Sequence, residues 1–202
     1  DGEPGINLFN LSTGQSRRIG AAVKNFEGIA FSPGGSLLAT GDIFQPLVWL
    51  WDVKTGRELE PLSMDYGINR FVQFSADGKS YGYLAATDRG FVLFVDGREA
   101  SSTGFPGVGG LVGAMQNGAP VWAYVAADSN GKHLVFDGKA GEGFDEITRL
   151  ELSRDGKHVI YSAKRAERWI IVRDSKVEPL PEDAISVSAI AIDIIDVFVI
   201  SA

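Results

Sequence analysis

A short motif that ends in a turn glycine recurs along the chain at nearly constant spacing. The glycines that close it are Gly14, Gly56, Gly97 and Gly138, so each follows the previous one at almost the same distance in sequence. A period of about 40 residues is typical of proteins in which similar units stack, each burying its apolar face against the next. The sequence therefore predicts a row of such units.

Each unit has the pattern of four short β-strands joined by tight turns. In the clearest unit, residues 28–41 indicate a strand, a Pro-Gly turn and a strand, and residues 48–58 indicate a strand, a Thr-Gly turn and a strand. The first half recurs at residues 71–83 and 150–161, and more weakly around Asn117-Gly118, a dipeptide typical of hairpin turns. No segment combines helical apolar periodicity with helix caps. We therefore expect an all-β fold of four-stranded antiparallel sheets.

A twisted four-stranded sheet cannot bury both of its faces alone. Stacking the sheets around a shared axis solves this problem, and that arrangement is the β-propeller. The sequence therefore predicts a single β-propeller domain over residues 1–202. The expected whole blades are residues 24–62, 67–102, 108–142 and 146–180.

The two ends of the chain each have the pattern of half a blade. Residues 1–20 provide only third and fourth strands, whereas residues 185–202 align without gaps with the first two strands of the clearest unit, so that Ile190 matches Ile29. We expect a fifth blade split between these two segments, because a split blade closes the ring and removes open sheet edges. Ile194-Ile195 replaces the usual turn formers there, so a fragment of a larger propeller, or strand exchange between chains, stays open.

Two segments resemble a known family. Phe31–Gly35 and Val48–Gly56, which includes the Trp51-Asp52 pair, resemble the WD-repeat β-propellers. Leu152–Val172 is similar to the bacterial WD40-like repeats of Tol-system type. The resemblance covers roughly residues 6–178 and implies a platform on which partners dock.

Composition and charge exclude several classes of function. The chain has 19 Lys and Arg against 26 Asp and Glu, a net charge of -7, whereas proteins that bind nucleic acid need clustered positive charge. It has no cysteine, which excludes disulfides and thiolate nucleophiles but leaves cytoplasm and periplasm both open. We expect no signal peptide in this chain and no membrane insertion, because the apolar run at residues 184–202 contains Asp193 and Asp196.

Signatures of catalysis and of cofactor binding are sparse. His133 and His158 each follow a lysine at an expected strand entry, a pattern that predicts solvent-facing side chains. Residues 128–131 begin like a calcium loop, but Lys139 stands where the final glutamate is required. The glycine cluster at residues 104–113 lacks the Lys-Ser or Lys-Thr of a phosphate loop. We expect no metal, no cofactor and no enzymatic activity.

Binding of a protein partner is the remaining hypothesis. The resemblance implies docking at the mouth formed by the loops after second strands and before first strands, where exposed aromatic and arginine side chains carry binding energy. The predicted contact residues are Phe44, Arg70, Arg89, Phe105 and Arg165. Two alternatives stay open: a small-ligand or metal sensor or hydrolase that uses the central channel, and a structural domain of a larger bacterial protein.

Overall fold

A computed structural model describes residues 5–20, 26–42, 44–63, 69–101, 104–181, 186–190 and 198–201. The regular structure in these residues is entirely β, as predicted, and it forms four four-stranded sheets and two two-stranded sheets. In the described part of the chain, no helix is long and apolar enough to cross a membrane.

Each four-stranded sheet is an antiparallel meander in which every strand pairs with the next one in sequence. The first sheet contains β3 (Phe26–Phe31), β4 (Leu37–Asp42), β5 (Leu47–Asp52) and β6 (Leu62–Ser63). The second contains β7 (Asn69–Phe74), β8 (Tyr81–Thr87), β9 (Gly90–Val95) and β10 (Arg98–Glu99). The third contains β11 (Gly107–Gln116), β12 (Ala119–Asp128), β13 (Gly131–Phe136) and β14 (Lys139–Phe144). The fourth contains β15 (Glu146–Leu152), β16 (Val159–Arg165), β17 (Arg168–Arg173) and β18 (Lys176–Pro179).

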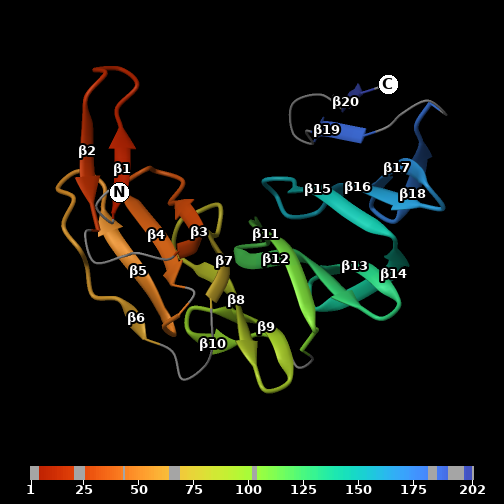
Figure 1. Cartoon of the computed structure of the whole chain (residues 1–202), viewed down its shortest axis with the longest axis horizontal. Coiled ribbons are helices and arrows are strands. Elements are labelled where there is room, and N and C mark those ends of the chain that lie inside the picture. Colours follow the sequence, from red (N-terminus) through yellow and green to blue (C-terminus); the bar gives the residue numbers. More distant parts are fainter. Residues whose placement is uncertain are drawn as a thin grey trace.

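The sheets follow one another in an arc with their first strands innermost. β3 contacts β7, β7 contacts β11, β11 contacts β15, and β15 contacts β19 (Ser186–Ile190), the first strand of the last hairpin. Figure 1 shows this succession as an arc that is open at the top. The radial stacking expected from the repeat is therefore present.

Large side chains pack between neighbouring sheets against small ones. The ring of Trp122 on β12 lies over Gly113 on β11 and reaches Gly82 on β8 in the preceding sheet. A Cβ atom at Gly113 would come within 2.4 Å of the indole ring, and one at Gly82 within 2.9 Å. These two positions require glycine because a side chain would overlap the ring.

The recurring Ser-x-Asp-Gly segment forms the turn between first and second strands. Ser75 and Ser153 are buried, and each donates a hydrogen bond of 2.7 Å to the aspartate two residues later. The Ser153 hydroxyl oxygen also accepts a hydrogen bond from the His158 amide at 3.0 Å. The serine hydrogen bond lowers the pKa of Asp155, because it stabilises the carboxylate. The predicted Asn-Gly turn is confirmed as well, with φ of 50° at Asn117 and 81° at Gly118.

The two terminal hairpins form separate sheets. β1 (Ile6–Phe9) pairs with β2 (Ser16–Ile19), and β19 pairs with β20 (Phe198–Ser201). Ile6 and Ile19 pack with Trp51 on the first sheet, whereas β19 contacts β15 and β16. These attachments hold the hairpins on opposite sides of the opening (Figure 1). The predicted closure through one split blade is therefore not seen in the described residues.

Candidate binding surfaces

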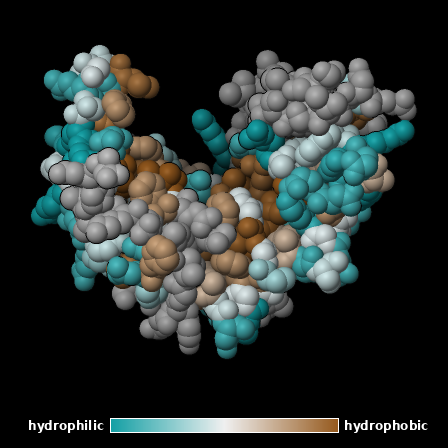
Figure 2. Space-filling model, in the orientation of Figure 1, coloured by the Kyte–Doolittle hydropathy of each residue, from teal (hydrophilic) through white to brown (hydrophobic). Residues whose placement is uncertain are grey.

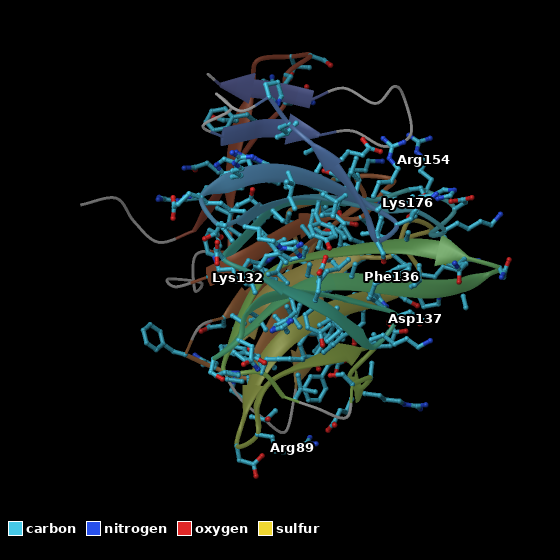
Figure 3. All side chains as sticks on the ribbon, turned by 90° about the vertical axis from the view of Figure 1, so that its right-hand side faces the viewer. Arg89, Lys132, Phe136, Asp137, Arg154 and Lys176 are labelled. Carbon is cyan, nitrogen blue, oxygen red and sulfur yellow. The ribbon has the colours of Figure 1, made fainter. Side chains whose placement is uncertain are left out.

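One end of every sheet carries the turns between second and third strands and the connections that lead to the next first strand. In an antiparallel meander both kinds of segment lie at the same end, because each strand reverses direction. We call this end the loop face. It is formed by the β4–β5, β8–β9, β12–β13 and β16–β17 turns and by the connections that enter β11 and β15. Figure 3 shows Lys132, beside one of these turns, on the side opposite Arg154 and Lys176.

Phe44 is the most prominent side chain of the loop face. It is 72% exposed, and its amide donates a hydrogen bond of 2.8 Å to the buried side chain of Asp42. The Gln45 amide donates to the same carboxylate oxygen at 3.1 Å. These two bonds form an Asx turn that fixes the backbone and leaves the aromatic ring in solvent.

The two predicted arginines with described side chains lie in or beside turns of this face, Arg165 as the last residue of β16, and both form ion pairs. Arg89 contacts Glu99 at 2.7 Å between Nη2 and Oε2. Arg165 contacts Glu142 of the preceding sheet at 2.8 Å, and its guanidinium lies 4.5 Å from the centre of the Phe144 ring. Arg165 therefore links two sheets as well as presenting a positive charge at the surface.

Phe105 and Arg70 occupy different environments from Phe44. Phe105 is only partly exposed, packs against a core cluster, and exchanges backbone hydrogen bonds of 2.7 and 3.0 Å with Phe91. A Cβ atom at the neighbouring Gly104 would lie 2.1 Å from the Arg89 carbonyl oxygen, which explains a glycine at this close approach. Arg70 lies near the start of β7 and pairs with Leu84, but its side chain is outside the described residues.

His133 is not solvent-facing, so that prediction is wrong. Its side chain is only 12% exposed, and Nε2 lies 3.0 Å from the Asp128 carboxylate while Nδ1 lies 3.1 Å from the Gly141 carbonyl oxygen. Burial opposes protonation, but these hydrogen bonds outweigh it and raise the pKa of His133. The side chain of His158 is 57% exposed, as expected for a solvent-facing residue, and its Nδ1 lies 2.8 Å from the Asp174 carboxylate. Among the described residues, no group of three acidic or histidine side chains could hold a metal ion.

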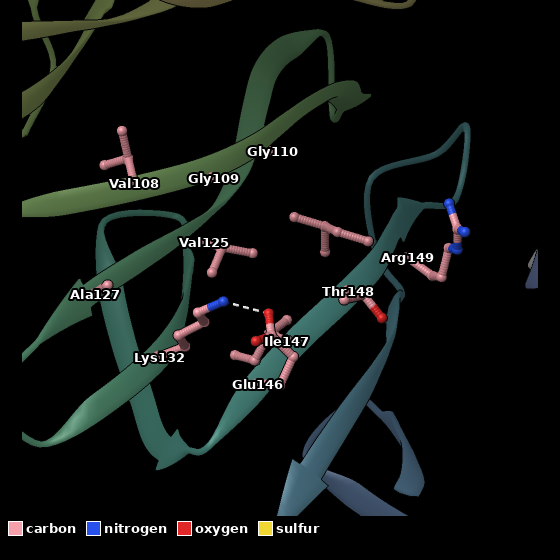
Figure 4. A pocket seen from close by; sticks show the side chains of 11 residues that line it. Val108, Gly109, Gly110, Val125, Ala127, Lys132, Glu146, Ile147, Thr148 and Arg149 are labelled. Atoms are coloured by element: carbon pink, nitrogen blue, oxygen red, sulfur yellow. Dashed lines mark hydrogen bonds and ion pairs between the residues drawn. The ribbon is translucent and has the colours of Figure 1, made fainter. Parts of the chain in front are cut away.

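A cavity of about 320 Å³ opens between the inner strands β11 and β15. Val108, Val125 and Ile147 give it an apolar lining, and Lys132 forms an ion pair with Glu146 at its edge (Figure 4). Thr148 and Arg149 add polar groups from β15. The cavity has the mixture of apolar surface and few polar groups that small-molecule sites have.

The first strand of each four-stranded sheet, and β19, contains a β-bulge that was not predicted from the sequence. The register shifts at positions 27, 71, 110, 149 and 188, always within the first strand and, from position 71 onward, at a constant interval. Phe71 and Arg149 have φ of 56° and 51°, unusual values for residues other than glycine. Such bulges re-aim side chains and concentrate near functional sites. The only sequence signal for them was the glycine at position 110.

A larger groove lies at the N-terminal end of the arc, with a cavity volume of about 680 Å³. Its apolar lining comes from Leu8, Phe9, Ile29, Phe31 and Val53. Phe9 is 71% exposed, Phe31 54% and Ile29 46%. Figure 2 shows hydrophobic surface at the tip of the β1–β2 hairpin and in the hollow between the two arms of the molecule. An exposed apolar surface of this kind marks an interaction site.

Comparison with known proteins identifies solved structures that have a similar fold. No protein-family model matches the sequence. A search of curated proteins finds no significant relative. Among solved structures, TolB from Acinetobacter baumannii is 12% identical with a TM-score of 0.59, and the match covers 88% of this chain and 49% of that one. Hydrazine synthase from Kuenenia stuttgartiensis is 14% identical with a TM-score of 0.66, and the match covers 90% of this chain and 61% of that one.

Both similar structures are β-propellers, and at these identities the likeness shows the fold alone. This chain spans about half the length of the TolB chain. The radial stacking of the sheets agrees with both matches. The chain therefore has a β-propeller fold, with successive four-stranded sheets in an arc that the described residues do not close.

Proposed function

We propose that this chain is a non-enzymatic scaffold that binds a protein partner through its loop face. The observation that carries the proposal is Phe44, an aromatic ring that is 72% exposed on a backbone fixed by Asp42. A rigid exposed aromatic side chain loses little conformational entropy on binding, which is why such residues dominate binding energies. Arg89 and Arg165 supply positive charge on the same face, each beside a glutamate.

The test is site-specific cross-linking followed by affinity measurement. A photoreactive amino acid replaces Phe44 in one variant and Lys176, on the opposite face, in a matched control. The captured protein is identified by mass spectrometry, purified and titrated against the chain. We expect Phe44→Ala to weaken its Kd by about tenfold or more, and Lys176→Ala to leave it unchanged. Equal affinity of the two variants would rule out the loop face as the docking surface.

A second candidate function is binding of a small ligand in the central channel. It is favoured by the cavity between β11 and β15, where the Lys132–Glu146 pair lies beside apolar residues. Screening small molecules by thermal shift tests it, with Gly109→Leu as the variant that fills the cavity. A ligand that stabilises the original chain and fails to stabilise this variant would support the channel function.

We also propose that the two terminal hairpins are halves of a fifth blade of WD-repeat type. The register shift at position 188 of β19 continues the constant interval that marks the first strands. The β1–β2 hairpin packs on the outer part of the first sheet, through Trp51 and Leu38, as third and fourth strands would. The alternative of a structural part of a larger bacterial protein is tested by the full reading frame.

A further inference from the structure

In the part of the chain that the structure describes, each terminal hairpin forms a sheet of only two strands. β19 and β20 correspond to the first two strands of a blade, and β1 and β2 correspond to the last two. In the complete sheets the second and third strands pair directly, as β4 and β5 do. One blade would therefore form if the free edge of β1 paired with the free edge of β20.

The hydrogen-bond pattern of β1 identifies the groups that are available at its free edge. The Asn10 amide donates to the Gln15 carbonyl oxygen at 2.8 Å, toward the β2 side of the hairpin. Backbone groups alternate along an antiparallel strand, so the amides of Leu8 and Ile6 also face β2. The amides of Asn7 and Phe9 consequently face away from β2, where an added strand can accept their hydrogen bonds.

The surface beside this edge has exposed apolar side chains that no other described residue covers. Of the seven large hydrophobic side chains exposed in the described residues, five lie on or beside the β1–β2 hairpin and β3: Phe9, Leu11, Phe26, Ile29 and Phe31. Ile29 and Phe31 alternate with the buried Ala30, which faces the second sheet. The same face of the first sheet is covered farther out, where Trp51 is 1% exposed beneath the hairpin. Among the described residues, no strand covers the inner half.

We infer that this groove binds strands β19 and β20 of a second copy of the chain, so that a blade is completed between two molecules. The inference rests on the proposed fifth blade but not on the loop-face function. The two surfaces have complementary strands, because in the described part of the chain β1 lacks the second strand that β20 would supply.

A second copy fits the structure better than closure within one chain. Within one molecule the β1–β2 hairpin packs on the first sheet through Ile6 and Ile19, whereas β19 lies against β15 and β16 at the opposite end of the arc. Joining them would require the intervening sheets to change their angles, but the interfaces between those sheets are tightly packed around residues such as Trp122. A second molecule can satisfy both edges while every packed interface stays in place.

The repeat predicts which residues would face each other. Aligning Gly14 with Gly56 places Ile6 at the position of Val48, which pairs with Gly41. Matching the register shifts of β3 and β19 makes Val199 the equivalent of Gly41, so Ile6 should lie opposite Val199. These two residues would form a non-hydrogen-bonded pair, so their Cα atoms should lie about 4.5 Å apart. A disulfide can span this distance.

The absence of cysteine from the chain makes a cross-linking test clean. Ile6→Cys and Val199→Cys are placed in separate molecules, mixed, and oxidised. We expect a disulfide-linked dimer that contains one of each. Ile6→Cys mixed with Ser201→Cys is the control, because a diagonal pair lies beyond disulfide reach at about 7 Å. A double variant that forms only an intramolecular disulfide would show closure within one chain and overturn the inference.

Mass measurement by light scattering provides the second test. The original chain should form species of at least twice its mass of 21.7 kDa at micromolar concentration. Phe9→Pro, which removes an outward amide, and Phe31→Asp should each return it to the monomer mass. Phe44→Asp alters an equally exposed ring on the loop face and should leave the assembly intact. A chain that is monomeric at all concentrations, or an assembly that survives both groove variants, would refute the inference.

These outcomes are separable from the loop-face function. Partner capture through Phe44 can fail while the groove variants still dissociate the assembly, and the reverse can also occur. Circular dichroism of each variant confirms that the sheets remain folded before its mass is interpreted.

Discussion

Replacing Gly113 with alanine tests how the sheets are packed. The new Cβ atom would come within 2.4 Å of the Trp122 ring, about 1 Å closer than ordinary contact allows. The ring cannot simply retreat, because its other side meets Gly82 of the second sheet. Overpacking of this kind costs about 1–3 kcal/mol. For a chain of this size, that loss corresponds to a fall in Tm of roughly 2–10 °C.

The assay is urea denaturation followed by tryptophan fluorescence and circular dichroism. Gly109→Ala on the same strand is the matched control, since a Cβ atom there would meet nothing within 4 Å. Trp122→Phe should relieve part of the strain, because the smaller ring can shift and the indole N–H is buried without a partner in the described residues. The double variant should therefore be more stable than the sum of the single effects predicts, by about 0.5 kcal/mol or more. A Gly113→Ala variant as stable as the original to within about 0.5 kcal/mol, or strict additivity, would refute this account of the packing.

Two further predictions concern buried hydrogen bonds. His133 has a raised pKa, so the stability from its charged contact with Asp128 is present below pH 6.5 and is lost as the pH rises through the folded value. His133→Gln should therefore lower Tm more at pH 5.5 than at pH 8.5, and an equal loss at both would contradict the assignment. Ser153→Ala should cost about 1–3 kcal/mol by leaving the His158 amide unsatisfied. It should also raise the pKa of Asp155 toward its ordinary value, measurable by NMR titration; an unchanged pKa would show that another group stabilises the carboxylate.

The sheets were predictable because their turns are formed by residues that are close together in the sequence. Asn117-Gly118 and the buried serine of each Ser-x-Asp-Gly segment fix hairpins within a few residues, and period-two alternation fixes the strands between them. Their regular spacing then predicts stacking, since each sheet needs its neighbours to bury its faces. Exposed Phe44 follows from the same logic, because it stands in a loop beyond the end of β4.

Features that depend on distant contacts were not predictable. Nothing near His133 in sequence reveals that the Gly141 carbonyl of the next strand approaches its ring. Phe105 resembles an exposed loop aromatic, but pairing with Phe91 draws it into the core. Closure of the ring depends on the angles between all the sheets at once, and a repeat length specifies the strands of a sheet without specifying those angles.

In most strands a residue both takes part in strand pairing and presents a side chain. The extra residue at the bulge of each inner strand presents a side chain without taking part in the pairing. Because strand pairing skips that position, the ladder of hydrogen bonds does not depend on which side chain occupies it. Phenylalanine, glycine and arginine already stand there in successive sheets of one molecule. A side chain at this position can thus be exchanged while the pairing of the strands that carry it stays the same.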